Sequence, residues 1–344
     1  MNLAIVGAHN NPTNAGLSNG SAYIFEYDNN LNEFVYLETL EQDSQSTNPS
    51  SLGSNSGNDR FGISVDIFDD GNIKYAAVVN SANKEAIIYE NTGNGWIAVF
   101  NTGNIGNSMT WPNIVINSEY MALSQNTNVN GSNINQQNNV LIYKKTNGAW
   151  NLHQTINAEA SSSNSYFSND IALSSENKLA IGAYNHNDFG AVFIYEINLL
   201  NGEFELEETL IDQLSGSSSF GYAVDIDQNN LLIGNSGDEI VYKYYKDQTW
   251  QLEDIITVAD VLSNGVTDIY GLGQSLALRN DIFFVNTMRD FLSLHRYSFI
   301  NLSNDGEPIP EFKDYVLFSV ILISGFAIFR RLPSIKYKKL KSGN

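Results

Sequence analysis

A block of 50 to 56 residues recurs along this chain of 344 residues, and it limits the fold more than any other feature. Each block opens with an aromatic–glycine-like pair, followed by an alternating segment, an apolar segment, a tyrosine-rich segment and a segment that an aromatic residue begins. Self-similarity at such a period is typical of propellers and solenoids. The opening pairs are Phe61-Gly62, Trp111-Pro112, Phe167-Ser168, Phe220-Gly221 and Leu272-Gly273.

The segments inside each block have the pattern of β-strands. Short alternating or continuous apolar runs separated by turns predict strands, and Asn-Gly turns such as Asn147-Gly148 predict hairpins. Four strands per block, repeated around a ring, form a β-propeller, which leaves few exposed sheet edges. We therefore expect an all-β fold, a β-propeller of six or seven four-stranded blades over residues 1–303.

Several blocks carry a more specific pattern, a Phe-Gly strand followed by a Leu-Ala-Ile-Gly-Ala strand and a Gly-x-Val-x-Ile-Tyr strand. It occurs at Phe61-Gly62, at residues 179–184 and 190–195, and at Phe220-Gly221. The pattern resembles FG-GAP repeats, which build the propeller of integrin α subunits and of many microbial surface proteins. The resemblance covers residues 3–300 and implies a binding role at the cell surface. Because the first block begins at its second strand and this family commonly has seven blades, we expect further sequence upstream.

The longest uncharged apolar run lies near the C-terminus, at residues 315–329. Fifteen helical residues rise about 22 Å, short of a bilayer core of about 30 Å, so the sequence predicts a short transmembrane helix or a buried core helix. The positive-inside rule favours the transmembrane helix and places residues 330–344 in the cytoplasm. The tail carries six basic and no acidic residues: Arg330, Arg331, Lys336, Lys338, Lys339 and Lys341.

A linker at residues 304–314 precedes this run and contains Pro310-Glu311-Phe312. A short Pro-Glu-Phe motif, an apolar span and a basic end together resemble the C-terminal sorting signals of prokaryotic surface proteins. The resemblance implies a sorting transpeptidase as a partner that acts near this motif. We expect a single-pass protein with its body outside the cell.

Charge and composition exclude several classes of protein. The net charge of −20 and the pI of about 4.4 argue against nucleic acid as a partner, because phosphates require a basic face. The absence of cysteine excludes disulfide frameworks, thiolate metal sites and cysteine nucleophiles. The sequence also lacks a Gly-x-Ser-x-Gly elbow and a phosphate-binding loop. We therefore expect no enzyme and name no catalytic residue.

One acidic loop is a candidate metal site. The FG-GAP resemblance implies calcium-binding loops between the first and second strands of a blade, and calcium prefers oxygen ligands. Asp66, Asp69 and Asp70 are the candidate calcium ligands, but Lys74 stands where a further carboxylate is expected. A polar hairpin turn without metal is the alternative, and no other cofactor is expected.

The aromatic residues that begin the fourth strands admit two interpretations. They could line a carbohydrate platform, or they could pack one blade against the next. Long loops rich in Asn, Ser and Gly, at residues 41–59 and 125–139, are either contact loops for a partner or flexible low-complexity segments. The aromatic residues concerned are Phe34, Trp96, Trp150, Phe204 and Trp250.

Taken together, the sequence predicts a membrane-anchored cell-surface propeller. It would bind an extracellular protein or polysaccharide without acting as an enzyme, and the acidic body disfavours anionic partners. The alternatives are an anchored hydrolase or lyase that acts on polysaccharide, and a structural envelope protein that assembles with itself.

Overall fold

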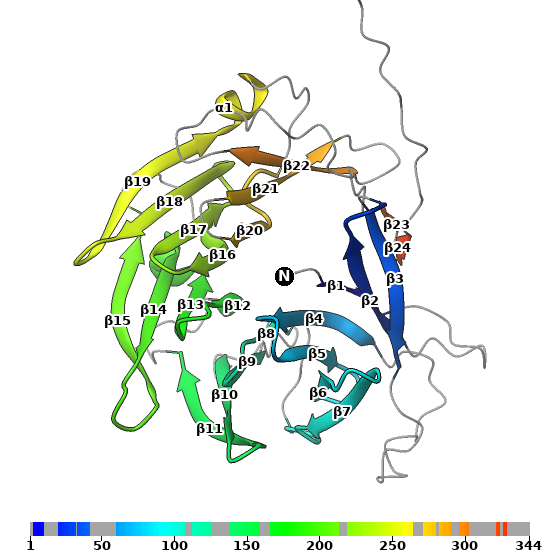
Figure 1. The fold of residues 1–344 in the computed structure, drawn as a ribbon. Helices are drawn as coiled ribbons and strands as arrows, with labels where there is room; N and C mark the ends of the chain where they lie inside the picture. Colours follow the sequence, from blue (N-terminus) through cyan, green and yellow to red (C-terminus); the bar gives the residue numbers. More distant parts are fainter. Residues whose placement is uncertain are drawn as a thin grey trace, which may run out of the picture.

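The protein is an all-β, propeller-like ring of six sheets in the computed structural model (Figure 1). We number the sheets 1 to 6 in chain order. The first strands of sheets 2 to 6 lie nearest the centre (Figure 1). The structure describes residues 3–9, 20–31, 33–41, 60–106, 112–125, 138–158, 166–212, 219–263, 271–279, 282–289, 296–302, 321–323 and 326–328.

Sheets 2 to 5 each have four antiparallel strands in sequence order, which confirms the predicted blade. Sheet 2 contains β4 (Phe61–Asp69), β5 (Lys74–Asn80), β6 (Glu85–Asn91) and β7 (Trp96–Asn101). Sheet 3 contains β8 (Ile114–Ile116), β9 (Tyr120–Gln125), β10 (Asn139–Thr146) and β11 (Ala149–Asn157). Sheet 4 contains β12 (Phe167–Leu173), β13 (Lys178–Ala183), β14 (Ala191–Ile197) and β15 (Phe204–Ile211), with a 3₁₀ turn at His186–Asp188. Sheet 5 contains β16 (Phe220–Asp227), β17 (Asn230–Asn235), β18 (Ile240–Lys246) and β19 (Trp250–Thr257).

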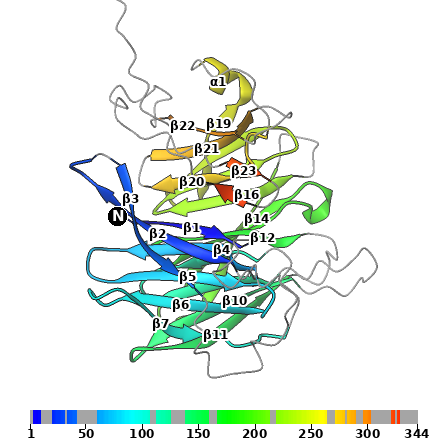
Figure 2. The ribbon, with the colours of Figure 1, turned by 90° about the vertical axis from the view of Figure 1, so that its right-hand side faces the viewer.

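Sheets 1 and 6 have three strands each among the described residues. The short helix α1 (Val258–Ser263) follows β19 and lies at the outer edge of the ring, as both views show (Figures 1 and 2). Sheet 1 contains β1 (Leu3–Ala8), β2 (Ser21–Asp28) and β3 (Glu33–Leu40), and sheet 6 contains β20 (Leu276–Arg279), β21 (Ile282–Arg289) and β22 (Arg296–Leu302).

The hydrophobic core lies between neighbouring sheets rather than at one centre. The second strands β9 and β17 are buried along their whole length, because one face packs on the preceding sheet and the other on the next. Each of five core clusters joins residues of two adjacent sheets, such as Ile142 of sheet 3 and Phe193 of sheet 4. A strand that is buried on both faces is continuously apolar, and this explains why the second segments do not alternate.

A register shift recurs between the last two strands of each of sheets 1 to 5. In sheet 4 it lies between Ile194 and Tyr195. Such bulges increase the local twist of a sheet.

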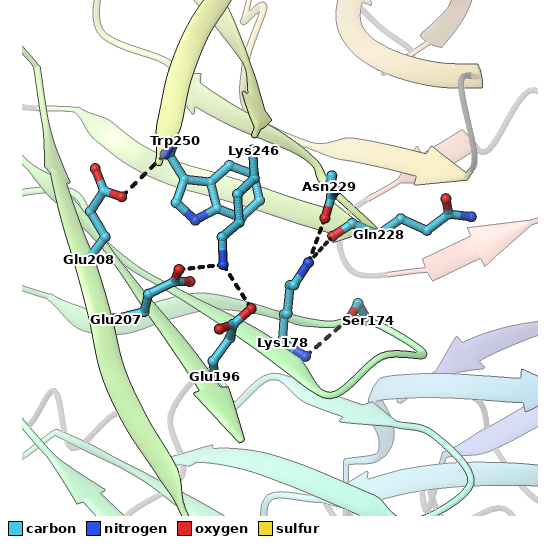
Figure 3. A network of polar contacts seen from close by, with 9 residues as sticks. All are labelled: Ser174, Lys178, Glu196, Glu207, Glu208, Gln228, Asn229, Lys246 and Trp250. Atoms are coloured by element: carbon cyan, nitrogen blue, oxygen red, sulfur yellow. Dashed lines mark hydrogen bonds and ion pairs between the residues drawn. The ribbon is translucent and has the colours of Figure 1, made fainter. Parts of the chain in front are cut away.

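Charged side chains join sheet 4 to sheet 5 (Figure 3). The ammonium group of Lys246 donates to Glu196 Oε1 at 2.8 Å and also pairs with Glu207. Lys178 of sheet 4 reaches across to the Asn229 side chain, with Nζ 2.8 Å from Oδ1. Lys145 of sheet 3 makes the equivalent contact to the preceding sheet, through Glu90 at 3.5 Å.

Replacing Lys246 with methionine is expected to lower the free energy of unfolding by about 1–2 kcal/mol, because Glu196 and Glu207 then lose the ammonium group that pairs with both. The expected loss of unfolding free energy is moderate, because Glu196 is 43% exposed and water partly screens its charge. Urea titration of tryptophan fluorescence measures the change. Adding Glu196→Gln and Glu207→Gln to the methionine variant should recover part of the loss. A triple variant no more stable than the single one would contradict this explanation.

The predicted transmembrane run at residues 315–329 is described only in part. Its described residues form two short strands, β23 (Ile321–Ile323) and β24 (Phe326–Ile328), which pair as an antiparallel hairpin where the sequence predicts a helix. Isoleucine and phenylalanine favour strands, so an apolar run of this composition does not by itself select a helix. Within the described residues, no helix has the length and apolar character needed to cross a membrane. The linker and the basic tail lie outside the described residues.

Candidate functional site

A cavity of about 750 Å³ lies at the centre of the ring. Its walls come from the first strands β4, β8, β12 and β16, and from the residues that lead into β20. Ligand sites of small molecules commonly have volumes of roughly 300–1,000 Å³. The cavity is therefore the first candidate for a functional site.

Three aspartates line this cavity, and each connects two sheets. Asp66 accepts the backbone N–H of Ile67 on Oδ1 at 2.8 Å and that of Ile116, in the next sheet, on Oδ2 at 2.7 Å. Each carboxylate thus bridges its own strand and the first strand of a neighbour. The same two bonds recur at Asp170 with Ile171 (3.1 Å) and Val224 (2.9 Å), and at Asp225 with Ile226 (2.8 Å) and Leu278 (2.6 Å).

The position of these carboxyls changes their acidity. Removal from bulk water raises the pKa of Asp66, Asp170 and Asp225 to about 7, although the backbone N–H bonds act in the opposite direction. Asp225 is also repelled by the charges of the other two. All three aspartate side chains are partly exposed and line the cavity, so solvent can reach them. The charge of the cavity therefore changes around neutral pH.

Three tyrosines gather on the wall where sheets 4 and 5 meet. Tyr184 stacks on Tyr166 with ring centroids 4.4 Å apart and an interplanar angle of 19°, and lies 5.3 Å from the ring of Tyr222. Burial and the neighbouring Tyr166 hydroxyl raise the pKa of Tyr184, so this phenol stays neutral over the physiological range. The cluster offers flat apolar rings together with hydroxyl groups.

Side-chain amides complete the polar lining. Asn113 donates to the backbone carbonyl of Asn169, and Asn169 donates in turn to the carbonyl of Tyr222 at 2.8 Å. Among the described residues, no group of three or more His, Cys, Asp or Glu side chains could hold a metal ion. Rings, hydroxyls and amides beside weakly acidic carboxyls suit the binding of a polar ligand that has a flat apolar face.

The predicted calcium ligands do not gather at one point. Asp69 Oδ1 accepts the N–H of Gly71, and Asp70 Oδ1 accepts those of Asn72 and Ile73, so both carboxylates cap the β4–β5 turn. Asp66 and Asp69 are three residues apart on an extended strand, which places their side chains on opposite faces. The Asp69 and Asp70 carboxylates thus hold a polar hairpin turn, and calcium binding by this loop stays a prediction.

Four of the five repeated aromatic residues pack between sheets. Trp150 contacts Tyr75 of the preceding sheet edge to face, with ring centroids 5.6 Å apart, and Phe204 contacts Tyr120 in the same way at 5.1 Å. Phe34 packs on Tyr27 within sheet 1. Trp96, Trp150, Phe204 and Trp250 are buried.

The two candidate contact loops lie outside the described residues apart from their ends, at residues 41, 125, 138 and 139. The sequence did not point to the tyrosine cluster or to two of the three cavity aspartates, Asp170 and Asp225. A usable pattern exists for one of them, because Phe-Gly-x-x-Val-Asp occurs at both Asp66 and Asp225.

No protein-family model matches the sequence, and no curated protein matches it either. Solved structures do match the fold. A protein from Lactobacillus plantarum is 12% identical over 90% of this chain and 80% of its own, with a TM-score of 0.55. A functionally unknown protein from Desulfotomaculum acetoxidans is 12% identical over 92% of this chain and 84% of its own, with a TM-score of 0.52.

Sqt1 from Saccharomyces cerevisiae is 15% identical, with a TM-score of 0.41, and the match spans 73% of this chain and 64% of that one, less than two thirds of its length. At such low identities the likeness concerns the fold alone. The likeness to the Lactobacillus and Desulfotomaculum proteins, together with the sheet layout of this chain, shows a propeller-like all-β fold.

Proposed function

We propose that this chain is a membrane-anchored, non-enzymatic cell-surface protein of the FG-GAP type that binds an extracellular protein or polysaccharide. The observation that carries the binding role is the stack of Tyr166, Tyr184 and Tyr222 on the wall of the central cavity. Such rings give a large contact area at a low cost in conformational entropy, because each has only two side-chain torsions. The FG-GAP assignment is supported by the Phe-Gly repeats, and the anchor by the apolar run and the six basic residues after it.

Charge narrows the class of partner. The protein carries a net charge of −20, and the three cavity aspartates add negative charge as pH rises through about 7. Like charges repel, so the favoured partner is neutral or cationic at the contact. Nucleic acid does not meet this condition.

One observation favours an enzyme as the second candidate. Carboxyls whose pKa lies near neutral pH can exchange protons, and a hydrolase or lyase that acts on polysaccharide needs such groups. Against this, both oxygens of each carboxylate already accept a backbone N–H. We therefore assign the three aspartates to joining sheets rather than to catalysis.

The test uses the full chain in mild detergent against an array of glycans and extracellular matrix proteins, with and without a calcium chelator. Tyr184→Ala is expected to weaken binding of the best ligand about tenfold or more, since it removes the central ring of the stack. Tyr245→Ala is the matched control, because Tyr245 is 45% exposed and lies on β18 outside the cavity. Equal loss in both variants would contradict a site at the tyrosines. Cleavage products from any glycan would mean that the protein is an enzyme rather than a binding protein. Binding to no glycan and no matrix protein would favour a structural protein that assembles with itself.

A further inference from the structure

Two adjacent leucines lie in the turn that joins β14 to β15, at the lower left of Figure 1. Leu199 is 91% exposed and Leu200 is 96% exposed, whereas no other large hydrophobic side chain among the described residues exceeds 59%. Single exposed apolar residues are ordinary on a protein surface, but an adjacent pair at the end of a hairpin is a candidate contact surface. We call Leu199 and Leu200 the leucine tip.

The turn is held in one conformation by its own hydrogen bonds. The backbone N–H of Asn198 donates to the carbonyl of Glu203 at 2.8 Å, and the N–H of Gly202 donates to the carbonyl of Asn198 at 2.7 Å. The N–H of Leu200 donates to Asn198 Oδ1 at 2.9 Å. These three N–H groups therefore keep their partners when the leucine tip leaves water. A bilayer requires this, because it offers no hydrogen bonds to a backbone in its interior.

The repeat does not require leucines at this place. The equivalent turns of sheets 2, 3 and 5 consist of glycine and polar residues, at 92–95, 147–148 and 247–249. The turn of sheet 1 has a single leucine, Leu31, which is 59% exposed. Polar turns therefore serve the fold equally well, and folding of the sheet does not explain the leucine tip.

The direction of the strands shows on which rim of the ring the leucine tip lies. Neighbouring strands of a sheet are antiparallel, so all third strands end on the rim where the turns to the fourth strands lie. In sheet 6, β20 takes the place of a first strand, because its Leu278 bonds to Asp225 of the sheet before it. β22 is thus a third strand, and its last residue, Leu302, lies on the same rim as the leucine tip.

The proposed anchor follows from this rim. Residues 304–314 separate the end of β22 from the apolar run at 315–329, and these eleven residues span at most about 40 Å when fully extended. An anchored run would begin within that distance of the rim that carries the leucine tip. This rim would therefore face the bilayer.

We propose that the leucine tip inserts into the surface of the bilayer that anchors the chain, and so fixes the orientation of the propeller-like body. The inference rests on the membrane anchor of the proposed function. A weak apolar contact does not hold a protein at a membrane alone, but the anchor keeps the tip close to lipid and makes the second contact intramolecular. The net charge of −20 favours lipids without net charge.

The test uses the full chain in phosphatidylcholine nanodiscs, in which part of the lipid carries a nitroxide quencher. The sequence has no cysteine, so Leu200→Cys takes a single environment-sensitive fluorophore. Interfacial apolar groups enter about 5–10 Å into the boundary of headgroups and acyl chains, so the quencher should remove about half of the fluorescence or more. Phe189→Cys is the matched control, because Phe189 is 49% exposed and lies between β13 and β14 on the opposite rim. Its label should keep its fluorescence.

A second substitution separates the leucine tip from the label. Leu200→Asp is added to a chain labelled at Leu199→Cys, where it places a charge beside the probe. A charge resists entry into lipid, so quenching should fall to the level of the Phe189→Cys control. Both leucines are almost fully exposed, so neither change is expected to disturb the fold, and circular dichroism checks this.

Each other outcome overturns the proposal in a distinct way. If the chain stays in the nanodiscs and the label at Leu200→Cys is no more quenched than the control, the tip contact is wrong and the anchor stands. If the nanodiscs do not retain the chain, the anchor is wrong and the inference falls with it. Equal quenching of both labels, or quenching that survives Leu200→Asp, means that the fluorophore itself enters the lipid. A signal that depends on protein concentration but not on the quencher would assign the leucine tip to a contact between copies.

Discussion

Replacing Gly221 with alanine is expected to lower the free energy of unfolding by about 3 kcal/mol or more. Gly221 has φ = +85°, where a side chain costs about 1–2 kcal/mol. A Cβ there would also collide with the backbone carbonyl oxygen of Ala191 and crowd the Val192 side chain. Overpacking of this kind adds about 1–3 kcal/mol, because backbone atoms cannot move aside as a flexible side chain can.

The chain offers a matched control for this substitution. Gly148 has φ = +83°, nearly the same, but a Cβ added there meets no atom within 4 Å. Gly148→Ala should therefore cost only the conformational part, about 1–2 kcal/mol. Urea titration of both variants measures the difference. Equal costs would mean that the backbone contact between sheets 4 and 5 contributes nothing.

The position of Gly221 explains why Phe-Gly pairs recur in the sequence. Gly221 faces Gly182 of the preceding sheet, and a methyl group on either residue would strike the neighbouring backbone. Two further junctions have the same arrangement, in which a glycine of a second strand faces a glycine just after the opening residue of the next block. These pairs are Gly7 with Gly62 and Gly234 with Gly273.

Lowering the pH from about 8 to about 5 is expected to stabilise the protein by about 2 kcal/mol or more. The pKa of Asp66, Asp170 and Asp225 is about 7 in the folded state, against 3.8 for an ordinary aspartate in water. A group whose pKa rises on folding binds more protons in the folded state between these two values. Its contribution to stability is therefore complete below about pH 4 and is lost as pH rises through about 7. Thermal melts across this range measure the trend.

The acidic surface also loses repulsion in acid, so a control must isolate the cavity. Asp225→Asn should flatten the pH dependence, because it removes one of the groups that titrates on folding. Asp254→Asn is the matched control: Asp254 also accepts the N–H of the following residue at 2.8 Å, but it is exposed. Its melting profile should keep the slope of the unchanged protein. If both variants change the slope of melting temperature against pH by the same amount, the pH dependence comes from surface charge.

The sequence predicted the blades well, because their strands repeat and the second strands are apolar on both faces. Phe61, Phe167 and Phe220 begin first strands as expected. Trp96 and Trp250 begin fourth strands, and Trp150 is the second residue of one. The blade pattern repeats because every junction buries the same kinds of surface.

The cavity residues were harder to find. A register irregularity follows the opening residue of β4, β12 and β16, so alternation along these strands does not tell which side chain faces the centre. Asp66 and Asp225 come five residues after the opening phenylalanine, whereas Asp170 comes three residues after it. The tyrosine cluster joins residues from separate segments, and no local pattern reveals such a contact.

The hydrogen bonds and ion pairs between sheets join each sheet to the next one along the chain. This order matters while the protein is being synthesised. Asp170 receives its second N–H from Val224, 54 residues later, and Lys246 reaches back 50 residues to Glu196. A nascent chain that ends after sheet 4 leaves the Asp170 carboxylate hydrated, and the arrival of β16 replaces water with an amide. Each sheet therefore docks on the one completed just before it, and assembly can follow translation one repeat at a time.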